Sequence, residues 1–141
     1  MKVNAHDADL KTWDPALDAV VVAPEHHVVL HEDDFIRVLS VRLGPGETEK
    51  PHHHQFPSIM VIDRGIKARD FDGVTHEEIN RPATSQGDAM LPVVVRLQPQ
   101  SLHYFENLDT KSFHGIRIEF KKGFPKEKGS IAGASYGYEE T

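Results

Sequence analysis

Short alternating or apolar stretches, separated by turn residues, make up most of the chain. The clearest is 35–43, in which Leu39, Val41 and Leu43 alternate with polar residues. A period of two predicts a half-buried β-strand. Glycine, proline and aspartate end each stretch, and no segment keeps a helical period over ten residues. Further strands are predicted at 28–30, 58–62, 66–72, 74–79, 90–97, 102–105 and 112–120. Many short strands at even spacing predict an all-β antiparallel sandwich or barrel.

The last predicted strand, 112–120, has two faces of different character. Ile116 and Ile118 lie on one face, and Arg117 and Glu119 lie on the other. Either face can line the interior of a barrel, so the pattern alone leaves the orientation open. Arginines are candidates for holding a substrate carboxylate through paired hydrogen bonds. The candidates are Arg64, Arg69, Arg96 and Arg117.

We expect one domain with two flanking segments. The 141 residues fit a single domain. We expect an N-terminal extension over 1–27, a barrel over 28–121 and a C-terminal tail over 122–141. The tail is rich in Lys, Gly and Ser before Tyr136 and Tyr138, which is typical of a mobile end or of an arm that orders against a partner.

Composition excludes several classes of function. The chain has no cysteine, which rules out disulfides, iron–sulfur clusters and thiol nucleophiles. A net charge of −6 with no long basic run argues against nucleic acid as a partner. No apolar stretch approaches the roughly 20 residues of a membrane span, and the start lacks a signal-peptide pattern. We therefore expect a cytoplasmic protein with no membrane partner.

Histidine is the residue that points to chemistry. Ten are present, and three are adjacent in Pro51-His52-His53-His54. On a strand, His52 and His54 point the same way, with Cα atoms roughly 6.6–6.8 Å apart, and His53 points the other way. Neutral imidazoles at that spacing can converge on one transition-metal ion. The alternative is a polar strand end whose histidines meet only water.

The intervals around this pair resemble the first motif of the cupins. Gly46, His52, His54 and Gly65 stand at the motif's intervals of Gly, His-x-His and Gly. The motif's glutamate would fall at Ser58, which is the one departure.

A second cupin motif is approximated further along the chain. His103 and Asn107 keep its interval of His to Asn, while the Pro99-to-His103 interval is one residue short and Ser101 replaces a glycine. A slip of one residue would turn Tyr104 inward in place of His103.

The resemblance implies a double-stranded β-helix, the jelly-roll barrel of the cupins, with one divalent transition metal and often a homodimer. By motif match, the metal ligands would be His52, His54 and His103. Iron(II) is the metal we expect, with Mn, Ni or Zn as alternatives, because imidazoles alone discriminate poorly. Catalytic residues are not assigned.

Loss of the motif's glutamate has a chemical consequence of its own. Three neutral imidazoles leave a divalent ion its full charge, which favours anionic, chelating oxygen ligands. Three-His iron cupins resembling acetylacetone dioxygenase exist in the family. The hypothesis is thus a dioxygenase or isomerase for a small anionic, oxygen-chelating metabolite. The alternative is a non-catalytic small-molecule binding or sensing cupin, with or without metal.

A second histidine group lies at 26–31. His27 and His31 share strand parity, which is compatible with an accessory metal site. We interpret them instead as residues of a solvent-facing edge strand.

Overall fold

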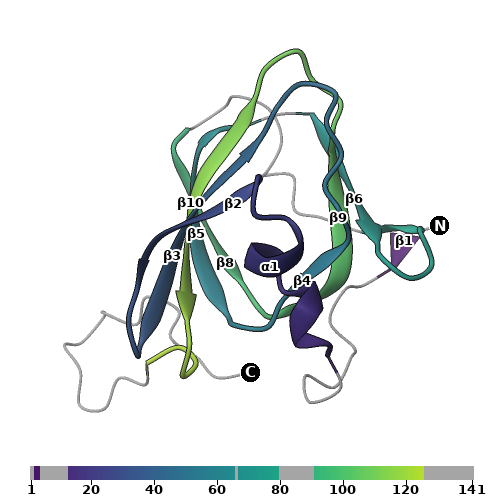
Figure 1. Ribbon diagram of the computed structural model, residues 1–141. Coiled ribbons are helices and arrows are strands. Elements are labelled where there is room, and N and C mark those ends of the chain that lie inside the picture. Colours follow the sequence, from purple (N-terminus) through teal and green to yellow (C-terminus); the bar gives the residue numbers. More distant parts are fainter. Residues whose placement is uncertain (1, 4–12, 66, 80–90, 126–141) are drawn as a thin grey trace.

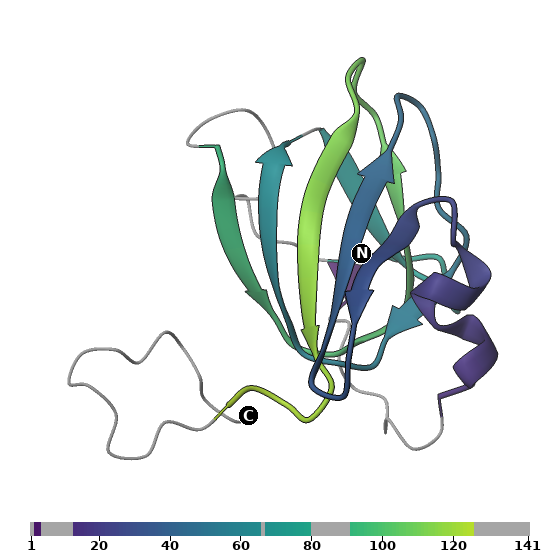
Figure 2. The same cartoon turned by 60° about the vertical axis from the view of Figure 1, so that its left-hand side comes forward.

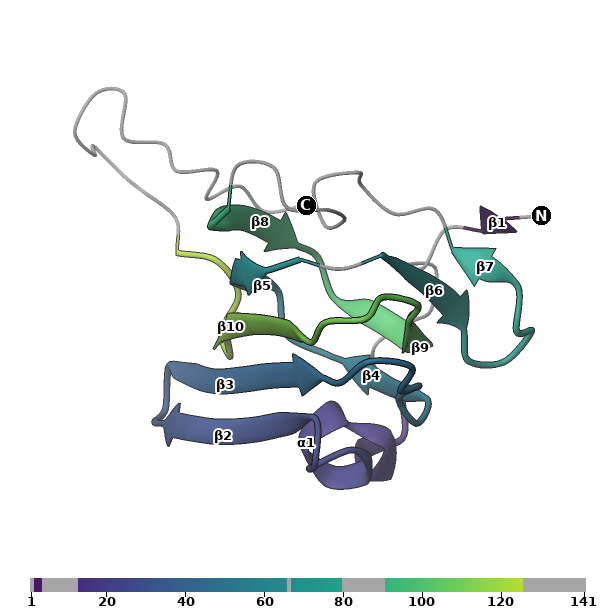
Figure 3. The ribbon, with the colours of Figure 1, turned by 90° about the horizontal axis from the view of Figure 1, so that it is seen from above.

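The structure is a computed structural model that describes residues 2–3, 13–65, 67–79 and 91–125 (Figure 1). Its strands form two five-stranded sheets, in the orders β1-β7-β6-β9-β4 and β2-β3-β10-β5-β8. Figure 3 shows these sheets from above, side by side. The elements are β1 (Lys2–Val3), η2 (Pro15–Leu17), α1 (Ala19–Val22), β2 (His27–Glu32), β3 (Ile36–Leu43), β4 (His52–His54), β5 (Ser58–Arg64), β6 (Ala68–Asp72), β7 (Glu78–Ile79), β8 (Val93–Leu97), β9 (Gln100–Asn107) and β10 (Phe113–Phe120).

The all-β prediction is confirmed, and so is the orientation of its clearest strand. Leu39, Val41 and Leu43 are buried on β3. They pack in a core with residues of β5, β6, β9 and β10, namely Met60, Ile62, Ala68, Phe105 and Phe113. β10 lies between β3 and β5 and pairs antiparallel with both. The core therefore joins both sheets and fixes the strands that surround the histidines.

The polar face of β10 is the one that points inward. Arg117 and Glu119 are 4% and 0% exposed, whereas Ile116 and Ile118 are half-buried. The barrel interior thus contains a pair of opposite charges on its central strand. This resolves the orientation that the alternation of β10 left open.

The described part of the predicted N-terminal extension packs against the barrel. Ala19 and Ala23 are fully buried, and α1 lies beside β2 and β4 (Figures 1 and 2). Asp18 caps α1 by accepting from Val20 N, and the same carboxylate accepts two hydrogen bonds from Arg37 Nη2. The extension is therefore tied to the first long strands by a buried ion pair.

The predicted tail over 122–141 falls largely on residues 126–141, which lie outside the described part. Of its described residues, Phe124 is buried and contacts Phe120 at 5.3 Å between ring centroids. No helix among the described residues is long and apolar enough to cross a membrane.

Candidate metal site

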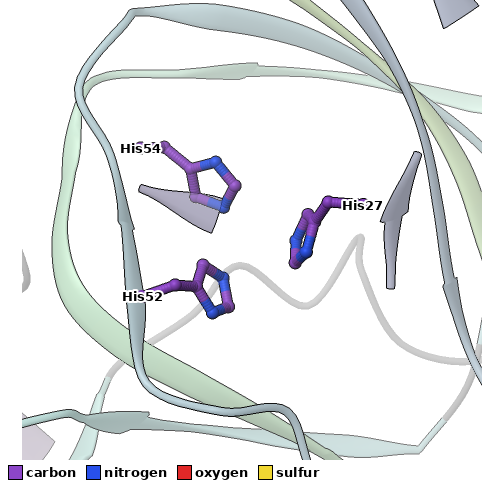
Figure 4. Close-up of side chains that lie close together, drawn as sticks. All are labelled: His27, His52 and His54. Carbon is purple, nitrogen blue, oxygen red and sulfur yellow. The ribbon is translucent and has the colours of Figure 1, made fainter. Parts of the chain in front are cut away.

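Three buried histidines converge between the two sheets. His52 and His54 come from β4, and His27 comes from the start of β2 in the other sheet. Figure 4 shows the three rings pointing toward one another. One ring nitrogen from each lies within 4.8 Å of the others, and the residues are only 1–3% exposed. Two imidazole nitrogens that bind one ion at about 2.1 Å are at most about 4.2 Å apart. Small side-chain adjustments thus allow one ion to reach all three.

The Nδ1 atom of each of the three rings lies beside a hydrogen-bond acceptor. His52 Nδ1 lies 2.7 Å from Lys50 O, and His27 Nδ1 lies 3.1 Å from Ala23 O. His54 Nδ1 lies 3.4 Å from Glu119 Oε2. Because a carbonyl or carboxylate oxygen only accepts, each Nδ1 carries the proton and each Nε2 keeps its lone pair. Metal-binding histidines are oriented by outer hydrogen bonds of this kind.

His103 stands next to the three-His group as a fourth imidazole. Its ring centroid is 4.7 Å from that of His52 and 5.5 Å from that of His54. Its Nδ1 lies 2.9 Å from the buried carboxylate of Asp70. Its Nε2 is buried without a hydrogen-bond partner. His103 is therefore held through Nδ1, as the other three are, and its Nε2 lies in the interior without a hydrogen-bond partner.

A bulge in β9 positions His103. On β4, His52 lies opposite His103 and His54 lies opposite Gln100. Two residues on β4 thus correspond to three residues on β9. The extra residue on β9 lets both Gln100 and His103 point inward, which regular alternation forbids. The bulge lies in the same stretch as the second motif's departures from the cupin pattern.

One carboxylate approaches the imidazoles directly. Glu49 Oε2 lies 3.4 Å from His27 Nε2, and Glu49 Oε1 lies 3.8 Å from His52 Nε2. Glu49 is 6% exposed, and its N–H donates to Phe105 O, which ties this segment to β9. The turn before it contains Gly46 at φ 72°, a conformation that favours glycine. Glu49 thus places a carboxyl group beside the Nε2 atoms.

Behind the histidines lies a buried network of charges. Glu119 accepts from Arg37 Nε through Oε1, while its Oε2 faces His54 and lies 3.8 Å from Arg117 Nε. Arg117 Nε donates to Ser58 Oγ at 3.0 Å. Arg117 Nη2 is buried and has no hydrogen-bond partner. Two arginines and two carboxylates (Arg37, Arg117, Asp18 and Glu119) therefore share the interior next to the histidines.

Burial keeps the three-His group neutral. It lowers the pKa of His27 to about 3, against the weaker opposing effect of the Ala23 hydrogen bond. Burial also lowers the pKa of His52 and His54 well below 6.5, with a further contribution from His103 at His52 and from Arg117 at His54. Burial lowers the pKa of Arg117 to about 10. At neutral pH the imidazoles are therefore uncharged, which is the form that binds metals.

Comparison with solved structures identifies the fold. The structure resembles a cupin domain from Bordetella pertussis Tohama I with a TM-score of 0.51 and 16% identity, over 67% of this chain and 91% of that one. The chain has the cupin fold. Two other structures are similar. One is a cupin family protein with a double-stranded β-helix fold from Methanocaldococcus jannaschii, with a TM-score of 0.47 and 13% identity over 67% of this chain and 77% of that one. The other is a protein with a double-stranded β-helix domain from Klebsiella pneumoniae, with a TM-score of 0.46 and 14% identity over 82% of this chain and 89% of that one. No protein-family model and no curated protein sequence matches the chain.

Within this fold, the first-motif histidines lie as their parity predicts. His52 and His54 share the interior, and His53 points away from them. His53 is nevertheless buried, because its Nε2 contacts Asp14 O at 2.7 Å and its ring lies 5.1 Å from that of Trp13. The reading in which these histidines meet only water is wrong.

The second motif is resolved in favour of His103. His103 is 4% exposed inside the cupin barrel, whereas Tyr104 is half-buried, stacks on Phe71 and contacts His76 Nδ1 through its hydroxyl. Asn107 is fully buried; its Nδ2 donates to Leu43 O at the end of β3 and to Lys111 O, and its Oδ1 accepts from Asp109 N in the turn after β9. It has a structural role.

Two site residues escaped the sequence analysis. Our interpretation of His27 as a solvent-facing residue is wrong, because β2 begins beneath α1 and buries its first residue. His31 is exposed as expected. A bulge between Val29 and His31 breaks the parity that His27 and His31 would share on a regular strand. Glu49 was missed because it lies in a turn, where no alternation indicates direction. Only its position three residues before His52 hinted at a role.

The residues fit a divalent transition metal. Neutral Nε2 lone pairs converge, the opposite nitrogens are all held, and His103 Nε2 is an orphaned buried atom that a metal would satisfy. Imidazole suits Fe, Zn, Cu and Ni, and a carboxylate suits hard divalent ions. Of the predicted ligands, two belong to the three-His group and His103 lies next to it. His27 is the third member of the group.

Proposed function

We propose that the protein is a metal-dependent enzyme, a dioxygenase or isomerase, that acts on a small anionic metabolite with chelating oxygen atoms. The observation that carries the proposal is the convergence of His27, His52 and His54, each with Nδ1 engaged and Nε2 free. We propose His103 as a further ligand and iron(II) as the metal, with Mn, Ni or Zn compatible with the same donors. The ion would polarise the substrate oxygens, and iron(II) would in addition supply redox chemistry.

The protein's own side chains have distinct tasks in this proposal. Asp70 and Glu119 fix the rings of His103 and His54 by accepting from their Nδ1 atoms. Glu49 supplies the negative charge that balances a cation at the Nε2 atoms. The burial of these groups excludes water, which strengthens electrostatic interactions in the site.

The test is metal content followed by turnover. The untagged protein is purified from cells supplied with iron, manganese, nickel and zinc, and its metals are measured by elemental mass spectrometry. We expect close to one equivalent in the wild type and a large loss in His54→Ala. His53→Ala is the matched control, because it removes a buried histidine that faces away from the site. Circular dichroism checks that both variants fold.

Turnover separates an enzyme from a binding protein. Oxygen uptake and product formation are followed with β-diketones and 2-oxo acids as substrates. Consumption that disappears in His54→Ala supports the proposal. A protein that stays empty after anaerobic addition of iron(II) refutes it. Stabilisation by these compounds without any product would instead favour a non-catalytic binding or sensing cupin.

A homodimer stays a prediction. Edge strand β2 exposes Val28, Val29 and Leu30 at 42–57%, and this is where a second copy would extend the sheet.

A further inference from the structure

Arg117 is a buried cation with an unused hydrogen-bond donor. Its side chain is 4% exposed and lies on the inward face of β10, in the same interior as the histidines. Nε is used by Ser58 Oγ, whereas Nη2 has no partner. An unsatisfied buried donor costs about 1–3 kcal/mol, and more when it is charged. Such an atom is therefore a site where a ligand acceptor gains affinity.

The carboxylate of Glu119, beside Arg117, already has other partners. Glu119 Oε1 accepts from Arg37, and Glu119 Oε2 faces His54 Nδ1 at 3.4 Å. Its distance of 3.8 Å from Arg117 Nε is too long for a hydrogen bond. Arg117 therefore has charge and donor capacity that Glu119 leaves unused.

The position of Arg117 links it to the metal site. Its Nε contacts Ser58, which occupies the place of the motif's glutamate. Glu119 Oε2 lies 3.8 Å from this Nε and 3.4 Å from His54 Nδ1. After burial, the charge of Arg117 is the largest cause that lowers the pKa of His54. A ligand held by the histidine side of the interior thus lies near the guanidinium.

We infer that Arg117 anchors a carboxylate of the ligand through Nη2, so that the substrate is a carboxylic acid whose other oxygens reach the metal. This inference rests on the proposed function, since it names the substrate class of the same site. A guanidinium donates to a carboxylate in charge-assisted hydrogen bonds, which are among the stronger ones in proteins.

The test uses two probes that share one chelating group. Pentane-2,4-dione and 2,4-dioxopentanoate are both β-diketones, and a carboxylate replaces one methyl group in the second. Their affinities for the zinc-loaded full chain are measured by calorimetry, because zinc binds without redox turnover. The variants are Arg117→Met and Arg117→Lys, and Arg42→Met is the control at an exposed arginine on the same sheet.

The preference for the carboxylate probe is the quantity compared. We expect it to fall about tenfold to hundredfold in Arg117→Met, to be partly retained in Arg117→Lys, and to be unchanged in Arg42→Met. The same preference in wild type and Arg117→Met overturns the inference. Equal affinity of the wild type for both probes also overturns it, and needs no folded variant.

Metal content keeps this outcome separate from that of the proposed function. A wild type that binds zinc but ignores the carboxylate refutes only the role of Arg117. A wild type that binds no metal refutes the proposed function, and the two probes are then compared by thermal stabilisation of the metal-free protein. A carboxylate preference that depends on Arg117 supports the anchor there too, and its absence overturns it.

Discussion

Acidification should unfold the metal-free protein steeply, because its buried histidines must stay neutral in the folded state. The pKa of His27 is lowered from 6.5 to about 3, and those of His52 and His54 lie well below 6.5. Above pH 6.5 the three are neutral in both folded and unfolded chains, so they add no pH dependence. Below it, the unfolded chain binds protons that the folded chain refuses. Stability therefore falls as the pH falls from 6.5 toward 3.

The size of the effect follows from the proton count. Each proton taken up on unfolding changes the free energy of unfolding by about 1.4 kcal/mol per pH unit. His27 alone accounts for about 5 kcal/mol over its whole window. Three such histidines give a slope of about 4 kcal/mol per pH unit, and domains have only about 5–15 kcal/mol in total. Asp33, whose pKa is lowered from 3.8 to about 2, loses its stabilising contribution mainly between these two values, at the acidic end of this window and below it.

The assay is urea unfolding of chelator-treated protein between about pH 7.5 and about pH 5, followed by circular dichroism and extrapolated to water. His27→Gln should reduce the slope by about 1.4 kcal/mol per pH unit. His31→Gln, at an exposed position of the same strand, controls for the loss of a histidine as such. A flat profile in the wild type, or an unchanged slope in His27→Gln, would refute the reasoning.

Two further predictions concern single side chains. Glu49→Gln keeps the shape of the side chain but removes the charge that faces His27 and His52. It should weaken metal binding about 10- to 100-fold in a chelator competition, and an unchanged affinity would contradict a role for Glu49. Asn107→Ala should cost about 3 kcal/mol of unfolding free energy, because it removes the side-chain hydrogen bonds to Leu43 O, to Lys111 O and from Asp109 N. Urea unfolding measures this cost, and a loss below about 1 kcal/mol would contradict it.

The strands were predictable wherever the alternation had one apolar and one exposed face. Leu39 and Leu43 on β3 satisfy that condition, and both are buried. β10 does not satisfy it, because its inward face carries Arg117 and Glu119. Their burial depends on partners from other strands, namely Arg37, Ser58 and His54. The alternation of residues within β10 does not show which partners the other strands provide.

The candidate site divides in the same way. His52 and His54 follow from the period of a strand, since both lie two residues apart on one face. His27 needs the pairing of β2 with β3, in which it lies opposite Val41, together with the cover that α1 provides. Glu49 needs the hydrogen bond that ties its turn to Phe105. The pair on one strand was thus found from the residues themselves, and His103 on β9 from the motif resemblance. His27 and Glu49, which depend on long-range pairing, were missed.

The structure also changes the charge argument for the ligand. A Ser in place of the motif's glutamate predicted a cation with its full +2 charge, held only by neutral imidazoles. Glu49 reaches the same imidazoles from the turn before β4, so a divalent ion there would keep a net charge of about +1 if Glu49 binds it.

Ser58 meanwhile accepts from Arg117 Nε, so the place of the motif's negative charge now adjoins a positive one. The proposed preference for an anionic ligand therefore rests on Arg117 more than on a missing carboxylate. This is why the comparison of wild type with Arg117→Met discriminates between ligand classes, whereas metal content alone does not.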